Sequence, residues 1–166
     1  MVIRFNADEV FEVAICTEQN GAAFYRKAAV LNAGKEDVEF LEKLAVMEDG
    51  HERIFDKMRK NLSEREKEPT VFDPLDEAGL YLSAMADTHG GEGSPAVADT
   101  LTGRESMAQI LETAIELEKK SILLYVGLRD LVPENLGKSQ IDTIINEEKS
   151  HVVVLQRKLN RVQGNA

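Results

Sequence analysis

The chain repeats itself at a constant offset of 100 residues. In each half a glutamate is followed seven positions later by a tyrosine, and a Glu-x-x-His motif lies further along. The equivalent residues are Glu18 and Glu118, Tyr25 and Tyr125, Glu48 and Glu148, and His51 and His151. The chain has only 3 histidines, and two of them belong to this repeat, which makes a chance coincidence a poor explanation. The repeat therefore predicts two similar halves.

Four stretches show the periodicity of amphipathic helices, and no stretch has a convincing strand pattern. The helices are expected at about 7–32, 35–62, 104–131 and 138–162. Asn6 with Glu9 and Thr102 with Glu105 have the spacing of capping boxes, while Gly34 and Pro133 are natural stops. The short connections at Gly34 and at 133–137 predict two antiparallel hairpins.

A long segment, 63–101, separates the two hairpins. It begins with charged, turn-prone residues and ends in the glycine-rich GGEGSPA. Between them Asp73 and Pro74 have the types preferred at a helix cap and at the first helical position. We interpret the segment as a crossover with a short extra helix, the alternative being a mobile linker. The expected architecture is one all-α domain, 1–166, with two antiparallel hairpins forming a four-helix bundle.

The spacing of the repeated residues predicts a metal site. Residues three or four apart lie on one face of a helix, so each Glu-x-x-His places both side chains on the apolar stripe. Packing the stripes together brings in four carboxylates and two imidazoles: Glu18, Glu48, His51, Glu118, Glu148 and His151. Unpaired charges there would cost several kcal/mol each, and cations resolve that cost. This ligand arrangement is that of carboxylate-bridged di-iron and di-manganese bundles, and its oxygen-rich chemistry suits iron or manganese better than a closed zinc site.

The neighbouring residues have less specific interpretations. Tyr25 and Tyr125 are expected to pack in the core with the hydroxyl bonded to a carboxylate, a redox role being the alternative. Cys16 is interpreted as a buried small residue or an inert thiol, and His89 as exposed. Four further glutamates are assigned to solvated faces and four methionines to packing: Glu12, Glu112, Glu116 and Glu147, and Met47, Met58, Met85 and Met107.

Composition excludes several classes of function. The chain has 20 Lys+Arg against 30 Asp+Glu, a net charge of -10, so it would repel nucleic acids and anionic membranes. Its single cysteine excludes a disulfide framework, a cysteine-based zinc site and a rubredoxin-type iron site within the chain. The longest apolar run, SILLYVGL, is too short to span a bilayer, and MVIRFNADEV does not have the pattern of a signal peptide. We expect a cytoplasmic protein.

The motifs together resemble those of the ferritin-like superfamily and, within it, of the rubrerythrin-like di-iron proteins. The resemblance rests on Glu18 with Tyr25, EDGH at 48–51, Glu118 with Tyr125, and EKSH at 148–151. It implies that Glu48 and Glu148 bridge two iron ions, with manganese or zinc as substitutes, and that the other two glutamates are terminal ligands. It further implies reduction of hydrogen peroxide or dioxygen, and a homodimer.

Two departures from the rubrerythrin pattern leave the function open. The chain cannot build a rubredoxin domain, so electrons would come from a separate redox protein or a small reductant. Ser121 stands where rubrerythrins carry an additional glutamate, one turn beyond Glu118. Three functions remain: an oxidoreductase, an iron-handling protein with ferroxidase or storage activity, and a metal-stabilised interaction module.

Overall fold

The computed structural model describes residues 7–32, 35–65, 67, 80, 97–132 and 137–164. Within these ranges every regular element is a helix, and none is a strand. The helices are α1 (Ala7–Asn32), α2 (Lys35–Lys60), α4 (Val97–Thr100), α5 (Met107–Leu131) and α6 (Lys138–Val162). The expected all-α fold class is confirmed.

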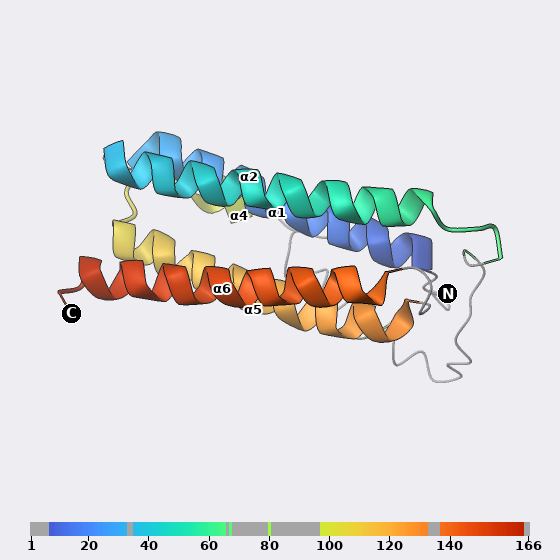
Figure 1. The fold of residues 1–166 in the computed structure, drawn as a ribbon. Coiled ribbons are helices and arrows are strands. Elements are labelled where there is room, and N and C mark those ends of the chain that lie inside the picture. Colours follow the sequence, from blue (N-terminus) through green and yellow to red (C-terminus); the bar gives the residue numbers. More distant parts are fainter. Residues whose placement is uncertain are drawn as a thin grey trace.

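The four long helices form two layers, each an antiparallel hairpin. Figure 1 shows α1 beside α2 and, across the bundle, α5 beside α6. Contacts of α1 with α5 and of α2 with α6 join the layers, so the equivalent helices of the two halves face each other. The end of α2 and the start of α5 lie at opposite ends of the bundle (Figure 1). The connection between them therefore crosses its full length.

Only part of that crossover is described. The extra helix expected from Asp73 to His89 lies outside the described residues, apart from Leu80. At the end of the crossover the short helix α4 packs against α1. Its Ala98 and the following Leu101 are both buried, which anchors the chain before it enters α5.

Two helix ends differ from expectation. The N-cap of α5 is Ser106, whose hydroxyl accepts from Gln109 N at 3.2 Å, while Ser106 N donates to Gln109 Oε1 at 2.9 Å. Glu105 instead closes the preceding turn, accepting from Thr102 N at 2.9 Å and Gly103 N at 3.0 Å. Because Gly103 has φ +83°, a turn and not a first helical turn forms there. Helix α2 ends at Lys60. The expected Asn6–Glu9 box and the stops at Gly34 and Pro133 lie outside the described residues or side chains.

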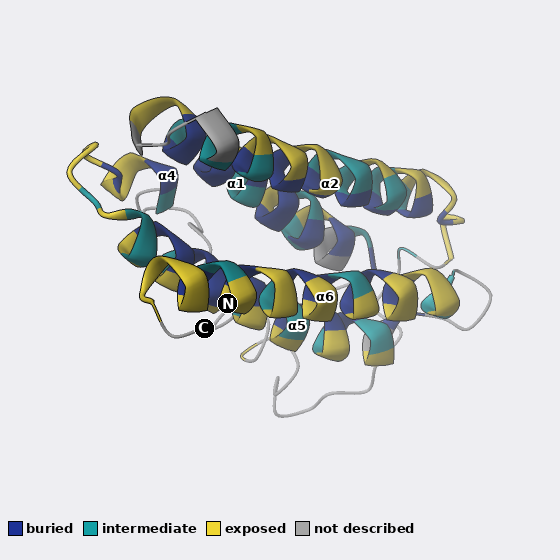
Figure 2. Cartoon of the chain, turned by 60° about the vertical axis from the view of Figure 1, so that its left-hand side comes forward, coloured by how far each residue is buried: buried dark blue, intermediate teal, exposed yellow. Residues whose placement is uncertain are grey.

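The core has two apolar clusters along the bundle axis. One contains Phe11, Phe55 and Leu128, and the other contains Phe24, Leu41 and Ile110. The charged residues of the repeat lie midway along the four long helices and are all buried. Figure 2 shows the buried strips of these helices on the sides that face one another. A polar centre is thus enclosed by apolar packing towards both ends of the bundle.

Candidate metal centre

All six residues predicted as ligands meet at the centre of the bundle. Each of the four long helices contributes, with Glu18 from α1, Glu48 and His51 from α2, Glu118 from α5, and Glu148 and His151 from α6. No member is more than 4% exposed. The spacing of three in each Glu-x-x-His motif places both of its side chains on the inner face, as helical geometry requires.

The six residues form two overlapping groups of four. Ligand atoms of Glu18, Glu48, His51 and Glu148 lie within 4.8 Å of one another, and so do those of Glu48, Glu118, Glu148 and His151. We call these the His51 quartet and the His151 quartet. Glu48 and Glu148 belong to both. Two adjacent cation positions sharing two carboxylates is the geometry of a bridged dinuclear site.

Each imidazole directs Nδ1 at the carboxylates. His51 Nδ1 lies 2.8 Å from Glu148 Oε1, 3.3 Å from Glu18 Oε2 and 3.5 Å from Glu48 Oε2. His151 Nδ1 lies 3.0 Å from Glu148 Oε2 and 3.6 Å from both Glu48 Oε1 and Glu118 Oε1. The rings stack with centroids 5.8 Å apart and planes 22° apart. Each quartet thus offers one nitrogen and three carboxylates to a common point.

Within the described residues, several of these buried atoms have no hydrogen-bond partner. They are Glu18 Oε2, Glu48 Oε1, both oxygens of Glu148, His51 Nδ1, and both ring nitrogens of His151. Burying polar atoms without partners costs free energy, and natural proteins keep few of them. Carboxylate oxygens and an imidazole Nδ1 that converge without hydrogen-bond geometry are suited to coordinate cations, so the donor set fits a pair of metal ions.

Electrostatic coupling changes the acidity of the cluster. Burial is the main cause that raises the pKa of Glu18 well above its ordinary value and that of Glu118 to about 7. Burial also opposes ionisation of Glu148, but its contacts with His151 and His51 outweigh burial and lower its pKa. Burial disfavours the imidazolium forms, yet the facing carboxylates raise the pKa of His51 and bring that of His151 to about 10. Without cations, protons would be held tightly here.

Two buried tyrosines cross-link the halves. The Tyr25 hydroxyl on α1 donates to Glu118 Oε1 on α5, and the Tyr125 hydroxyl on α5 donates to Glu18 Oε1 on α1. Burial, followed by the charge of the partner carboxylate, raises the pKa of both phenols, so each hydroxyl keeps its proton. These bonds match the carboxylate-bonded role expected from sequence and orient the two glutamates that belong to one quartet each.

Glu147 was assigned to a solvated face, but it also contacts the centre. Its Oε2 lies 2.7 Å from His51 Nε2, while the side chain remains 45% exposed. The periodicity of α6 alone places Glu147 beside the inner face and not on it. Only the packing of α6 against α2 brings it to His51. A signal for this contact was therefore absent from the sequence of either helix.

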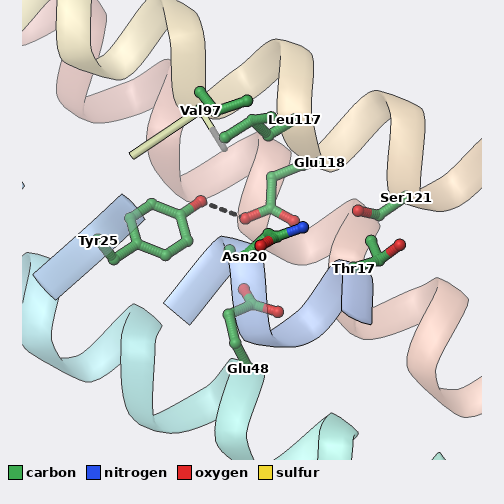
Figure 3. A pocket seen from close by; sticks show the side chains of 9 residues that line it. Thr17, Asn20, Tyr25, Glu48, Val97, Leu117, Glu118 and Ser121 are labelled. Atoms are coloured by element: carbon green, nitrogen blue, oxygen red, sulfur yellow. Dashed lines mark hydrogen bonds between the residues drawn. The ribbon is translucent and has the colours of Figure 1, made fainter. Parts of the chain in front are cut away.

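A small pocket reaches the cluster from the side of α1 and α5. Figure 3 shows the Tyr25–Glu118 hydrogen bond and Ser121, all at the pocket wall. Gly21 gives it room, since an added Cβ would lie 3.5 Å from Glu48 Cγ. The lining residues are Thr17, Asn20, Gly21, Tyr25, Glu48, Val97, Leu117, Glu118 and Ser121. Val97 is the first residue of α4, so this short helix completes the pocket.

Other expectations had mixed outcomes. Cys16 is exposed and not buried, and partial burial followed by the charge of Glu12 raises the pKa of its thiol, which disfavours the reactive thiolate. Met47 is 41% exposed and is not a core residue, whereas Met58 is buried. Glu12, Glu112 and Glu116 are exposed as expected. His89 lies outside the described residues. Among the described helices, none has the length and hydropathy needed to cross a bilayer.

Comparison with known proteins supports the fold. A solved structure from Thermotoga maritima, provisionally described as a ferritin-like diiron-carboxylate protein, matches with a TM-score of 0.73 and 24% sequence identity. The match covers 95% of this chain and 96% of that chain. No protein-family model matches the sequence, and no curated protein matches it. The ferritin-like fold expected from sequence is thus confirmed.

Proposed function

We propose that the chain is a di-iron carboxylate protein that reduces hydrogen peroxide or dioxygen. The observation that carries this proposal is the pair of overlapping quartets that share Glu48 and Glu148. The description of the Thermotoga maritima structure as a diiron-carboxylate protein also supports iron as the metal.

In this proposal each ligand has a defined role. Glu48 and Glu148 would hold both ions, because they alone belong to both quartets. Glu18 and Glu118 would each hold one ion, and His51 and His151 would each offer Nδ1, the nitrogen that faces the carboxylates. Two divalent cations balance the charge of four carboxylates, which removes the repulsion and desolvation that otherwise oppose burying them together.

The pocket supports redox chemistry over a purely structural metal pair. A closed structural site excludes exogenous ligands, whereas Glu48 and Glu118 line a space that a small oxidant can enter. When bound, a diferrous pair supplies one electron per ion, enough to reduce peroxide to two waters with two protons. Tyr25 holds a protonated hydroxyl at Glu118, in the pocket wall, and fixes the carboxylate that faces the oxidant.

The partners follow from the same chemistry. A single cysteine cannot hold a rubredoxin-type iron, so a separate redox protein or a small reductant would return the electrons. We also propose a homodimer, from the rubrerythrin resemblance. The net charge of -10 argues against nucleic acid and anionic membranes as partners.

Anaerobic iron loading followed by stopped-flow addition of peroxide tests the function. Fast oxidation of both irons, followed by many turnovers once a donor is added, supports the reductase. Stoichiometric oxidation accompanied by mineral growth would assign the chain to iron handling instead. Inertness towards peroxide and dioxygen would leave only a metal-stabilised interaction module.

A further inference from the structure

The two quartets differ at one equivalent position. Their tyrosines are reciprocal, Tyr25 with Glu118 and Tyr125 with Glu18. The residue before the bridging glutamate is not equivalent, because α6 has Glu147 where α2 has Met47. The symmetry of the repeat is thus broken beside the metal centre.

This difference determines what the outer nitrogen of each imidazole contacts. His51 Nε2 lies 2.7 Å from Glu147 Oε2. His151 Nε2 is buried and, within the described residues, has no hydrogen-bond partner. Met47, the equivalent of Glu147, has a thioether that is at best a weak acceptor, and its side chain is 41% exposed. Within the described residues, the outer nitrogen of His51 therefore contacts a carboxylate, and the outer nitrogen of His151 does not.

A carboxylate that accepts a hydrogen bond from the outer nitrogen of a metal-binding histidine has a known physical effect. Because carboxylate oxygens accept hydrogen bonds, the Glu147 contact places the proton on His51 Nε2 and leaves Nδ1 free to coordinate. Such a contact fixes the ring and increases its basicity, and its removal typically lowers metal affinity about 10–100-fold. Among the residues that the structure describes, no equivalent carboxylate contacts His151 Nε2.

We propose that Glu147 is a positioning residue that makes the two metal positions unequal, so that the His51 quartet binds a divalent cation more tightly than the His151 quartet. The inference rests on the proposed di-metal function. The two metal positions also differ in how they face the pocket. The pocket is lined by the shared Glu48 and by Glu118, which belongs to the His151 quartet alone, whereas Glu18 and His51 are not among its lining residues. The weaker position therefore faces this pocket.

Titration of metal-free protein with Co²⁺, followed by its visible spectrum and by calorimetry, tests the inference. The wild type should bind two equivalents in two steps with affinities about tenfold or more apart. In Glu147→Ala the tighter step should weaken by about 10–100-fold, so the steps merge and the spectrum of the first equivalent changes. Glu147→Gln, which keeps an accepting oxygen, should fall between the two proteins.

Two further variants separate positioning from general stability. Met47→Glu restores the missing carboxylate at an exposed position and should tighten the weaker step. Glu42→Ala removes an exposed glutamate elsewhere on α2 and should leave both steps unchanged. A lowered melting temperature of Glu147→Ala with both binding steps intact would mean that Glu147 has only a structural role.

The outcomes also separate this inference from the proposed function. Two equal Co²⁺ steps in the wild type, unaffected by Glu147→Ala, would overturn the inequality and leave the dinuclear centre standing. Binding of fewer than two equivalents by the wild type would overturn the dinuclear centre itself and this inference with it.

Discussion

Removing metal should make the stability of this protein depend on pH in a specific direction. Burial raises the pKa of Glu118 from 4.5 to about 7 in the folded chain. The folded state therefore binds this proton more tightly than the unfolded state does. The resulting stabilisation is fully present below the unfolded pKa of 4.5 and is lost as the pH rises through about 7. Metal-free protein should thus be more stable at pH 5 than at pH 8.

The size of the effect follows from the shift. At about 1.36 kcal/mol per pKa unit, the change at Glu118 corresponds to roughly 3 kcal/mol of unfolding free energy. For a chain of this length that corresponds to about 6–12 °C in melting temperature. The raised pKa values of Glu18 and His151 act in the same direction. The lowered pKa of Glu148 acts oppositely, but only as the pH falls below its unfolded value of 4.5.

The assay is thermal unfolding of protein stripped of metal beforehand, from pH 5 to pH 8, with and without reconstitution. The stabilisation gained from metal should grow with pH, because protons substitute for cations at the acidic end. Glu118→Gln removes the titrating group and should flatten the slope of the metal-free protein. A metal-free melting temperature that is constant or rises between pH 5 and pH 8 would refute the reasoning.

Two further predictions concern the pocket and the tyrosines. Tyr25→Phe and Tyr125→Phe each remove a buried hydrogen bond to a carboxylate. Denaturant unfolding of the metal-loaded protein should therefore show that either variant loses about 1.5–3 kcal/mol of unfolding free energy. A loss in only one of the two variants would contradict the equivalence of the two tyrosines. Ser121→Glu places a carboxylate one turn from Glu118 at the pocket wall, and should change the charge-transfer spectrum of the oxidised protein and speed peroxide-driven oxidation. An unchanged spectrum with a melting temperature lowered by an overpacking cost of about 1–3 kcal/mol would make Ser121 a packing residue.

Helical periodicity and the repeat were sufficient to predict the bundle and the convergence of the six ligand candidates. Both depend on which face of a helix a residue occupies, and that face is fixed by its spacing from the apolar residues. The boundaries were less predictable. Thr102 with Glu105 and Ser106 with Gln109 are two overlapping capping patterns, and only the positive φ of Gly103 decides between them.

The contact of Glu147 with His51 and the pocket could not be predicted from the periodicity of the separate helices. Glu147 is close to His51 because α6 packs against α2 at a particular rotation, which depends on every side chain between them. The pocket has the same origin, since Gly21, Ser121 and Val97 come from three elements that are distant in sequence. The interpretation of Cys16 as a buried residue was wrong. Its position lies off the apolar stripe of α1, and the residue is exposed.

Metal stoichiometry of three variants tests the dinuclear centre most directly. After reconstitution with iron under anaerobic conditions, the wild type should hold two ions per chain. Glu18→Ala disrupts only the His51 quartet and should retain one ion, whereas Glu48→Ala disrupts both quartets and should abolish the pair. Glu12→Ala removes an exposed carboxylate that pairs with Arg59 and should still bind two. A wild type that saturates at one ion, or equal effects of Glu48→Ala and Glu12→Ala, would contradict the account.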